Sequence, residues 1–169
     1  MTLTIREATE DDALDTLALR RAVLAEGRWF ITEEDEHVDS LELEQSVIRQ
    51  LSRQPNCLYL VAHEGSALVG LVQLQGGALR RMRHAAKMEI LVAEGHRGQG
   101  TGGALLGEAL DWAKANSGLS KIGLAVLAHN TRAIALYERH GFQIEGRRDK
   151  EYLTVTGQFW GDVLMYRFV

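Results

Sequence analysis

Apolar residues recur along this chain with two different periods, and the switch between the periods predicts its secondary structure. Leu14, Leu17 and Leu24 follow a candidate N-cap at Thr9 and share one face at helical spacing, which predicts a helix from Thr9 to about Leu24. A second helical stripe covers residues 41–51. Both stripes lead into polar or helix-breaking residues, as amphipathic helices usually do.

Shorter apolar runs bounded by turn residues predict β-strands. Two more helices are expected, one after the glycine-rich stretch that begins at Gly95 and one from Asn130 to His140, with Gly141 as its stop. The predicted strands are Leu3–Glu7, Cys57–Ala62, Ala67–Leu74, Ala85–Val92, Ile122–Leu127, and a closing hairpin of Phe142–Val155 and Gln158–Phe168.

The order of these elements, β-α-α-β-β-β-α-β-α-β-β, predicts a mixed α/β fold built around antiparallel hairpins. The chain has one proline and no low-complexity segment. We therefore expect a single domain that spans residues 1–169.

Composition excludes several classes of function. A net charge of −4 lacks the basic footprint of a nucleic-acid-binding protein. The single Cys57 allows no intramolecular disulfide, and the six histidines show no paired ligand spacing, so no metal is expected. The first seven residues include an acidic one and lack the basic and then apolar pattern of a signal segment. No apolar run reaches membrane-spanning length. These features predict a cytoplasmic protein with no membrane or nucleic-acid partner.

The most informative stretch lies between the predicted strand Ala85–Val92 and the helix that follows it. Four of the six residues from Gly98 to Gly103 are glycines. Glycine permits positive φ and lets a ligand approach the backbone closely, and a helix directs its first unpaired N–H groups and its positive dipole end into the preceding turn. A flexible turn would need only one or two glycines. The pattern favours an anion site suited to phosphate or pyrophosphate.

Two nucleotide-binding loops share part of this spacing. A P-loop would need Lys followed by Ser or Thr where the chain has Thr101-Gly102. Gly98-x-Gly100-x-x-Gly103 does satisfy the dinucleotide fingerprint, which would indicate an oxidoreductase. An antiparallel hairpin precedes it, however, and the next predicted strand carries no acidic residue to hold a ribose. Both readings are therefore disfavoured.

Two sequence blocks resemble the GCN5-related N-acetyltransferase (GNAT) superfamily. Arg97–Gly102, followed by Ala104–Leu106, is similar to its coenzyme A-binding signature, and Asn130–Phe142 is similar to its helix that runs from an asparagine to a tyrosine and ends in Gly-Phe. The likeness is dense from about Ala85 to Phe142. It implies the GNAT fold, a mixed and mostly antiparallel sheet flanked by helices, with strands that splay apart at the cofactor site.

The resemblance implies acetyl-CoA as the co-substrate. Its pyrophosphate would bind backbone N–H groups of the glycine-rich turn, and Arg97 would either add charge or be a solvated side chain. Its pantetheine arm would pair with the preceding strand as an added strand would, which requires that strand to part from Ile122–Leu127; a fully paired strand is the alternative. The implied cofactor-binding residues are Ile90, Leu91, Val92, Arg97, Gly98, Gln99, Gly100, Thr101, Gly102, Gly103 and Asn130.

The implied reaction is direct attack of a neutral amine on the thioester in a ternary complex, with an N–H near Leu91 polarising the carbonyl. Cys57 lies in an apolar run and is expected to be buried rather than nucleophilic. Asn130 and Tyr137 are seven residues apart and so share a helix face. By resemblance, Tyr137 is the general acid that protonates the departing thiolate; a core tyrosine and a helix-capping asparagine are the alternatives.

The general base is harder to assign. Some family members place a glutamate five residues before the asparagine, but this chain has Ala125 there. Glu89, on the strand before the turn, is the candidate base, because partial burial could raise its pKa. The alternative is a surface carboxylate paired with Lys87 or a nearby arginine.

The resemblance does not name the acceptor amine, whose pocket in this family is usually built by the first helices and their connection. Trp29 and Phe30 could line that pocket or belong to the core. An acidic run without Lys or Arg would attract a cationic acceptor, although acids are also ordinary at a helix start. The run comprises Glu33, Glu34, Asp35, Glu36, Asp39, Glu42 and Glu44.

Two further readings stay open. A catalytically silent acyl-CoA-binding sensor is the competing function, and the presence of Tyr137 argues against it. The closing hairpin could form a homodimer surface, as in many members of the superfamily.

Overall fold

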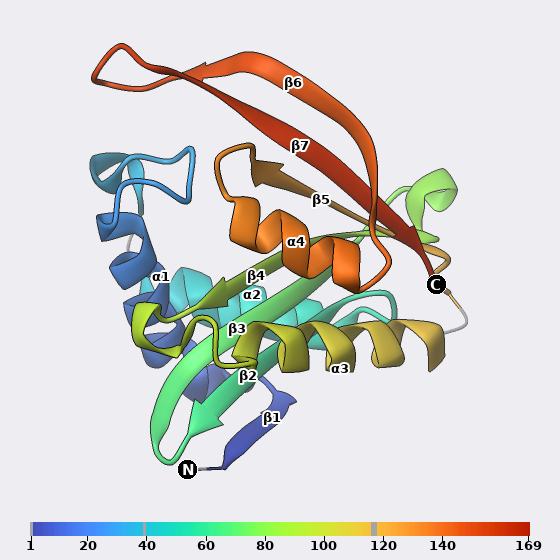
Figure 1. Cartoon of the computed structure of the whole chain (residues 1–169). Helices are drawn as coiled ribbons and strands as arrows, with labels where there is room; N and C mark the ends of the chain where they lie inside the picture. Colours follow the sequence, from blue (N-terminus) through green and yellow to red (C-terminus); the bar gives the residue numbers. More distant parts are fainter. Residues whose placement is uncertain (1, 39, 116–117) are drawn as a thin grey trace.

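The computed structural model describes residues 2–38, 40–115 and 118–169, and its seven strands form one sheet (Figure 1). Its order of helices and strands confirms the predicted one. The elements are β1 (Leu3–Glu7), α1 (Ala13–Ala25), α2 (Leu41–Arg53), β2 (Leu58–Glu64), β3 (Ala67–Gly76), β4 (Ala85–Val92), α3 (Thr101–Ala115), β5 (Lys121–Leu127), α4 (Thr131–Arg139), β6 (Gln143–Leu153) and β7 (Phe159–Phe168).

Neighbouring strands are antiparallel except at the centre of the sheet. The strand order is β1-β2-β3-β4-β5-β7-β6, and only β4 and β5 are parallel. These two strands pair at Ala85–Lys87 with Lys121–Gly123 and then separate, so that β4 continues to Val92 without β5 beside it. Figure 1 shows the two arrows diverging. The predicted splayed, mostly antiparallel sheet is thus confirmed.

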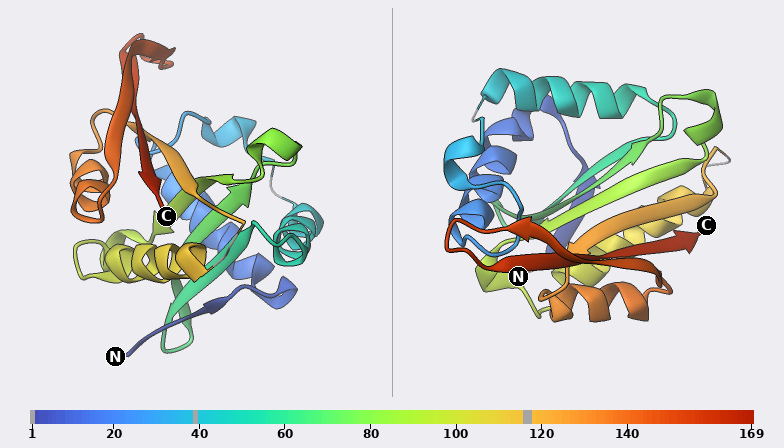
Figure 2. Two further views of the ribbon diagram at one scale, coloured as in Figure 1. Left: turned by 90° about the vertical axis from the view of Figure 1, so that its right-hand side faces the viewer. Right: turned by 90° about the horizontal axis from the view of Figure 1, so that it is seen from above.

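Helices cover both faces of this sheet (Figure 2). Side chains alternate between the faces along each strand, so Leu71 of β3 packs with the cluster under α1 and α2, whereas Val72 and Leu74 pack with the cluster under α3 and α4. Among the described helices, none has the length and apolar character needed to cross a bilayer.

The first helix differs from its prediction. A 3-10 turn, η1 (Glu10–Asp12), precedes α1, which begins only at Ala13. Leu14, expected on the buried face, is 66% exposed, and the small residues Ala13 and Thr16 are fully buried instead. The extra turn delays the helix, and small side chains let α1 lie close enough to α2 for Thr16 to donate a hydrogen bond to Glu44.

A buried carboxylate ties the start of this helix to the sheet. Asp12 accepts two hydrogen bonds of 2.7 Å from the guanidinium of Arg6 on β1 and one of 2.8 Å from the N–H of Thr9. Arg6 holds the pKa of Asp12 at about 2. The carboxylate therefore stabilises the fold in its charged form.

We expect Asp12→Ala to lower the free energy of unfolding by about 1–2 kcal/mol at pH 7, because it removes a cap and an ion pair together. The folded-state pKa of Asp12 lies below its unfolded value of about 3.9. Its contribution is therefore complete above that value and is lost as the pH falls toward 2. Urea unfolding at pH 7 and pH 3 measures this, with exposed Asp11→Ala as the control. An equal difference at both pH values would contradict it.

Candidate functional site

A cleft of about 1040 Å³ opens where β4 and β5 separate. Its walls are the end of β4, the glycine-rich turn, the end of β5 and α4, and the segment after α1 closes one side. The cleft therefore exists because two neighbouring strands stop pairing, which exposes backbone groups that a complete sheet would have satisfied.

The backbone of β4 faces this gap only at alternate residues. The N–H of Ala93 donates to the carbonyl of Val69 on β3, so the peptide groups of Leu91, two residues earlier, also face β3. Of the N–H groups near Leu91, those of Ile90 and Val92 therefore face the gap, and polarisation of a bound carbonyl by one of them stays a prediction.

The glycine-rich turn adopts the backbone conformation that the sequence predicts. Gly98 and Gly100 have φ values of 76° and 95°, which favour glycine. The first intrahelical hydrogen bond of α3 runs from the N–H of Ala104 to the carbonyl of Gly100. The N–H groups of the residues between them lie at the helix start without an intrahelical acceptor. Their arrangement suits an anion.

Side chains of the turn point away from this anion site. The Gln99 amide donates to the carbonyl of Gly95 at 2.6 Å, and Thr101 is buried. Neither lines the cleft, so only their backbone could contact a ligand. A Cβ on Gly102 would lie 3.3 Å from the side chain of Leu136, so this glycine also lets α3 approach α4.

Arg97 makes contacts that sequence reasoning missed. Its guanidinium donates to both carboxylate oxygens of Glu26 at 2.6 and 2.7 Å, and its Nε donates to the carbonyl of Val92 at 2.8 Å. The alternative of a solvated side chain is thus wrong. Glu26 lies 71 residues earlier, and its position just after α1 gave no local signal of this pairing.

An aromatic contact joins the two sides of the cleft. The indole N–H of Trp29 donates to Glu26 at 2.5 Å. The Trp29 ring stacks on His129 with centroids 6.2 Å apart, and His129 meets Trp160 of β7 edge-on at 4.7 Å. Trp29 and Phe30 both line the cleft and pack against the core; a contact of either ring with the acceptor stays a prediction.

Asn130 and Tyr137 both line the cleft from α4, as their shared helix face predicts. The Asn130 side chain caps α4 by accepting from the N–H of Ala133. Tyr137 is 7% exposed, and none of the described residues hydrogen-bonds to its hydroxyl. Burial, and secondarily the negative charge of Glu89, raises the pKa of Tyr137 above its ordinary range. The phenol therefore stays protonated at neutral pH and can donate a proton or hydrogen bond.

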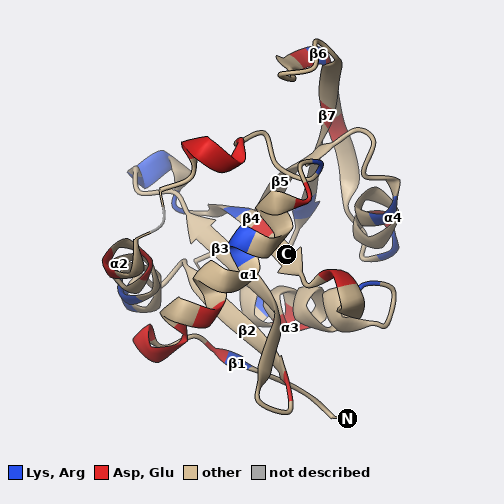
Figure 3. Ribbon diagram, turned by 90° about the vertical axis from the view of Figure 1, so that its left-hand side faces the viewer, with Lys and Arg blue, Asp and Glu red and all other residues tan. Residues whose placement is uncertain are grey.

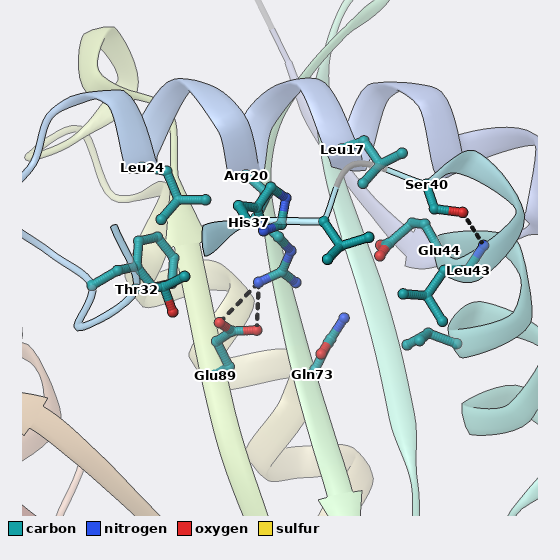
Figure 4. Close-up of a pocket in the computed structure, with 13 residues that line it drawn as sticks. Leu17, Arg20, Leu24, Thr32, His37, Ser40, Leu43, Glu44, Gln73 and Glu89 are labelled. Carbon is teal, nitrogen blue, oxygen red and sulfur yellow. Dashed lines mark hydrogen bonds and ion pairs between the residues drawn. The ribbon is translucent and has the colours of Figure 1, made fainter. Parts of the chain in front are cut away.

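The Glu89 side chain lies on the face of β4 that α1 covers. The Arg20 guanidinium donates to both of its carboxylate oxygens at 2.9 and 3.0 Å (Figure 4). Glu89 is thus paired with an arginine, Arg20 of α1, and not with Lys87. The Glu89 side chain remains 38% exposed, and it lines both the cleft and a smaller adjoining cavity.

This smaller cavity has a volume of about 350 Å³ and lies between α1, the connection that follows it, α2 and the sheet (Figure 4). Of the described members of the acidic run, only Glu44 lines it. The η2 turn (Glu34–Glu36) is exposed on the surface (Figure 3), and Asp39 lies outside the described residues. The acidic run as a whole therefore does not form a pocket.

Residues 19–142 match the family described as the Acetyltransferase (GNAT) family. The chain is 29% identical to a spermidine N(1)-acetyltransferase of Vibrio cholerae over 138 residues, which cover 82% of this chain and 76% of that protein. It is 28% identical to an L-amino acid N-acetyltransferase of Escherichia coli over 110 residues, which cover 65% and 67%.

Solved structures have the same fold. A GNAT-family acetyltransferase from Streptococcus pneumoniae superposes with a TM-score of 0.94 at 28% identity and covers 99% of this chain and 100% of its own. A phosphinothricin acetyltransferase from Sinorhizobium meliloti, solved in complex with acetyl-CoA, has a TM-score of 0.87 at 22% identity, with coverage of 100% and 89%.

Gly100→Val tests the turn. We expect it to weaken acetyl-CoA binding at least about tenfold, because a side chain at φ 95° is strained and must shift the backbone that offers the N–H groups. Calorimetric titration measures the affinity, with Gly107→Val as the control. Gly107 lies within α3, the helix that follows the turn, and an added Cβ there meets open space. Equal affinities for the two variants would exclude this turn as the anion site.

Proposed function

The chain belongs to the acetyltransferase (GNAT) family, and we propose that it moves the acetyl group of acetyl-CoA to a primary amine of a small molecule or peptide. The observation that carries this proposal is the separation of β4 from β5. It brings unpaired strand peptides, an anion-binding turn and a protonated phenol to one cleft.

The cleft suits coenzyme A in three places. The peptide groups of Ile90 and Val92 can pair with the pantetheine amides as an edge strand would, and the carbonyl of Val92 already accepts from Arg97. The N–H groups from Gly98 to Gly103 can hold the pyrophosphate without meeting a Cβ at Gly98 or Gly100. Asn130 lines the wall between these places.

In the proposed reaction the amine nitrogen attacks the thioester carbonyl carbon, the C–N bond forms and the C–S bond breaks. The N–H of Ile90 stabilises negative charge on the carbonyl oxygen. Tyr137 supplies a proton to the departing sulfur, and its raised pKa keeps that proton available. Cys57 is buried outside the cleft, and burial raises the pKa of its thiol. This supports direct transfer without a cysteine intermediate.

We assign Glu89 as the group that receives the amine proton, directly or through water. Its carboxylate borders both the cleft and the smaller cavity, which is where an amine entering from the α1 side would meet the thioester. Arg20 fixes its orientation through two hydrogen bonds. The ion pair therefore positions the proton acceptor.

A silent acyl-CoA sensor would use the same cleft without turnover. Tyr137 disfavours that alternative, since a sensor has no need of a phenol beside the reacting sulfur. The named relatives act on different amines, a polyamine in one case and an amino acid in the other, so similarity alone does not choose the acceptor.

Tyr137→Phe separates the enzyme from the sensor. We expect kcat to fall about 10²-fold or more, because a general acid is lost, while the dissociation constant of acetyl-CoA changes less than about threefold. Thiol release against a panel of amines measures turnover, and titration with acetyl-CoA measures binding. An unchanged kcat would remove Tyr137 from the mechanism. Wild-type binding of acetyl-CoA without turnover on any amine would favour the sensor.

Glu89→Gln should lower kcat/KM about 10²-fold near pH 7. The deficit should shrink as the pH rises toward the pKa of the acceptor, because more of the amine then arrives already neutral. A pH profile of kcat/KM measures both effects. Lys87→Ala, at an exposed position of the same strand, is the control and should match the wild type. A deficit that is constant across pH would assign Glu89 a role other than proton acceptance.

A further inference from the structure

One carboxylate in the smaller cavity is buried without a cation in contact. Glu44 is 7% exposed. Its Oε1 accepts from the hydroxyls of Thr16 at 3.0 Å and Tyr59 at 2.7 Å, and both donors are neutral. No described residue hydrogen-bonds to Oε2 or forms a salt bridge with this side chain. Burying a carboxylate in this way is unfavourable unless a positive charge accompanies it.

No charged group of the described lining is in contact with Glu44. Arg20 is the one arginine or lysine among the described lining residues; its hydrogen bonds go to Glu89, and Glu44 attracts it only over a longer distance. Among the described lining residues, the two carboxylates of Glu44 and Glu89 therefore share one guanidinium, and that guanidinium is hydrogen-bonded to Glu89.

The two carboxylates lie at opposite ends of a polar row across the sheet. Tyr59, Gln73 and Glu89 are paired neighbours on β2, β3 and β4, and adjacent strands are about 4.8 Å apart, so the row spans about 10 Å. Glu44 bonds to Tyr59 at one end, and Glu89 borders the cleft at the other. Figure 4 shows the Glu44 and Glu89 side chains on either side of Gln73.

Apolar side chains from the two helices cover the space beside this row. Leu17, Leu43 and Val47 line the cavity together with Glu44. A ligand that fits has a charged end for Glu44, a short aliphatic middle and a second end that reaches Glu89. A cavity of about 350 Å³ can hold a chain of that size.

We propose that this cavity binds a second positive charge of the acceptor, with Glu44 as its counter-ion, so that the acceptor is an aliphatic diamine or polyamine. This inference rests on the proposed acetyl transfer. The amine at the Glu89 end reacts, and the distal ammonium pairs with Oε2 of Glu44. An acceptor with a carboxylate in that place would need Arg20 to leave Glu89 and would leave Glu44 without a counter-ion.

Three acceptors with the same four-carbon chain test the proposal: 1,4-diaminobutane, butylamine and 4-aminobutanoate. We expect the wild type to show a KM for the diamine at least about tenfold below that for butylamine, and the weakest use of 4-aminobutanoate. Glu44→Gln keeps an oxygen for the Thr16 and Tyr59 hydroxyls but loses the charge. It should abolish the preference for the diamine, and an unchanged acetyl-CoA affinity would show that the cofactor cleft is intact.

Glu42→Gln is the matched control, because it removes the same charge from an exposed position of the same helix. It should retain the full preference for the diamine. If Glu44→Gln does not fold, the wild-type preference and its decline with added salt test the same claim. Equal use of diamine and butylamine, a preference for 4-aminobutanoate, or an equal loss in both glutamate variants would overturn the inference.

Calorimetric titration of 1,4-diaminobutane in the presence of coenzyme A separates this inference from the proposed function. Binding of the diamine that Glu44→Gln weakens at least about tenfold supports the cation site even if no amine is acetylated, in which case only the transfer proposal fails. If butylamine is acetylated as efficiently as the diamine, the cation site is disproved and the proposed acetyl transfer stands.

Discussion

The site depends on the hydrogen bonds that β4 and β5 do not make. After three paired residues the two strands diverge, which leaves peptide groups at the end of β4 without a strand partner on that side. The α3 and α4 helices pack on one face and define the width of the opening, and α1 closes the other face. The candidate residues Glu89, Asn130 and Tyr137 all line the cleft that this divergence opens.

Two ion pairs hold α1 and the segment after it against the end of β4. Arg20 of α1 bonds to Glu89, and Glu26, just after the helix, bonds to Arg97 beyond the end of the strand. The first pair fixes a carboxylate at the junction of the two cavities. The second pair engages the guanidinium of Arg97 beside the glycine-rich turn and, through Trp29, links that turn to the opposite wall at His129.

Local patterns were sufficient to predict the order of elements, the turn and the shared face of Asn130 and Tyr137. Each of these depends on residues close in sequence, where helical or strand periodicity fixes direction. The predictions that failed depend on long-range pairing. The contacts of Arg97 depend on a carboxylate outside its own segment. Which N–H groups near Leu91 face the gap depends on the register of β4 with β3, which the sequence does not reveal. Leu14 was misplaced because the 3-10 turn before α1 left no clear signal.

The anchored positions also divide the connection between α1 and α2 into two parts. Glu26 bonds to Arg97 beside the glycine-rich turn and Trp29 contacts His129 across the cleft, whereas Ile31 and Val38 are more than half exposed. The outer part can therefore exchange residues during evolution with little disturbance to the inner part. Val38 of the outer part also lines the smaller cavity, so a substitution there would reshape that cavity and leave the contacts of Glu26 and Trp29 in place.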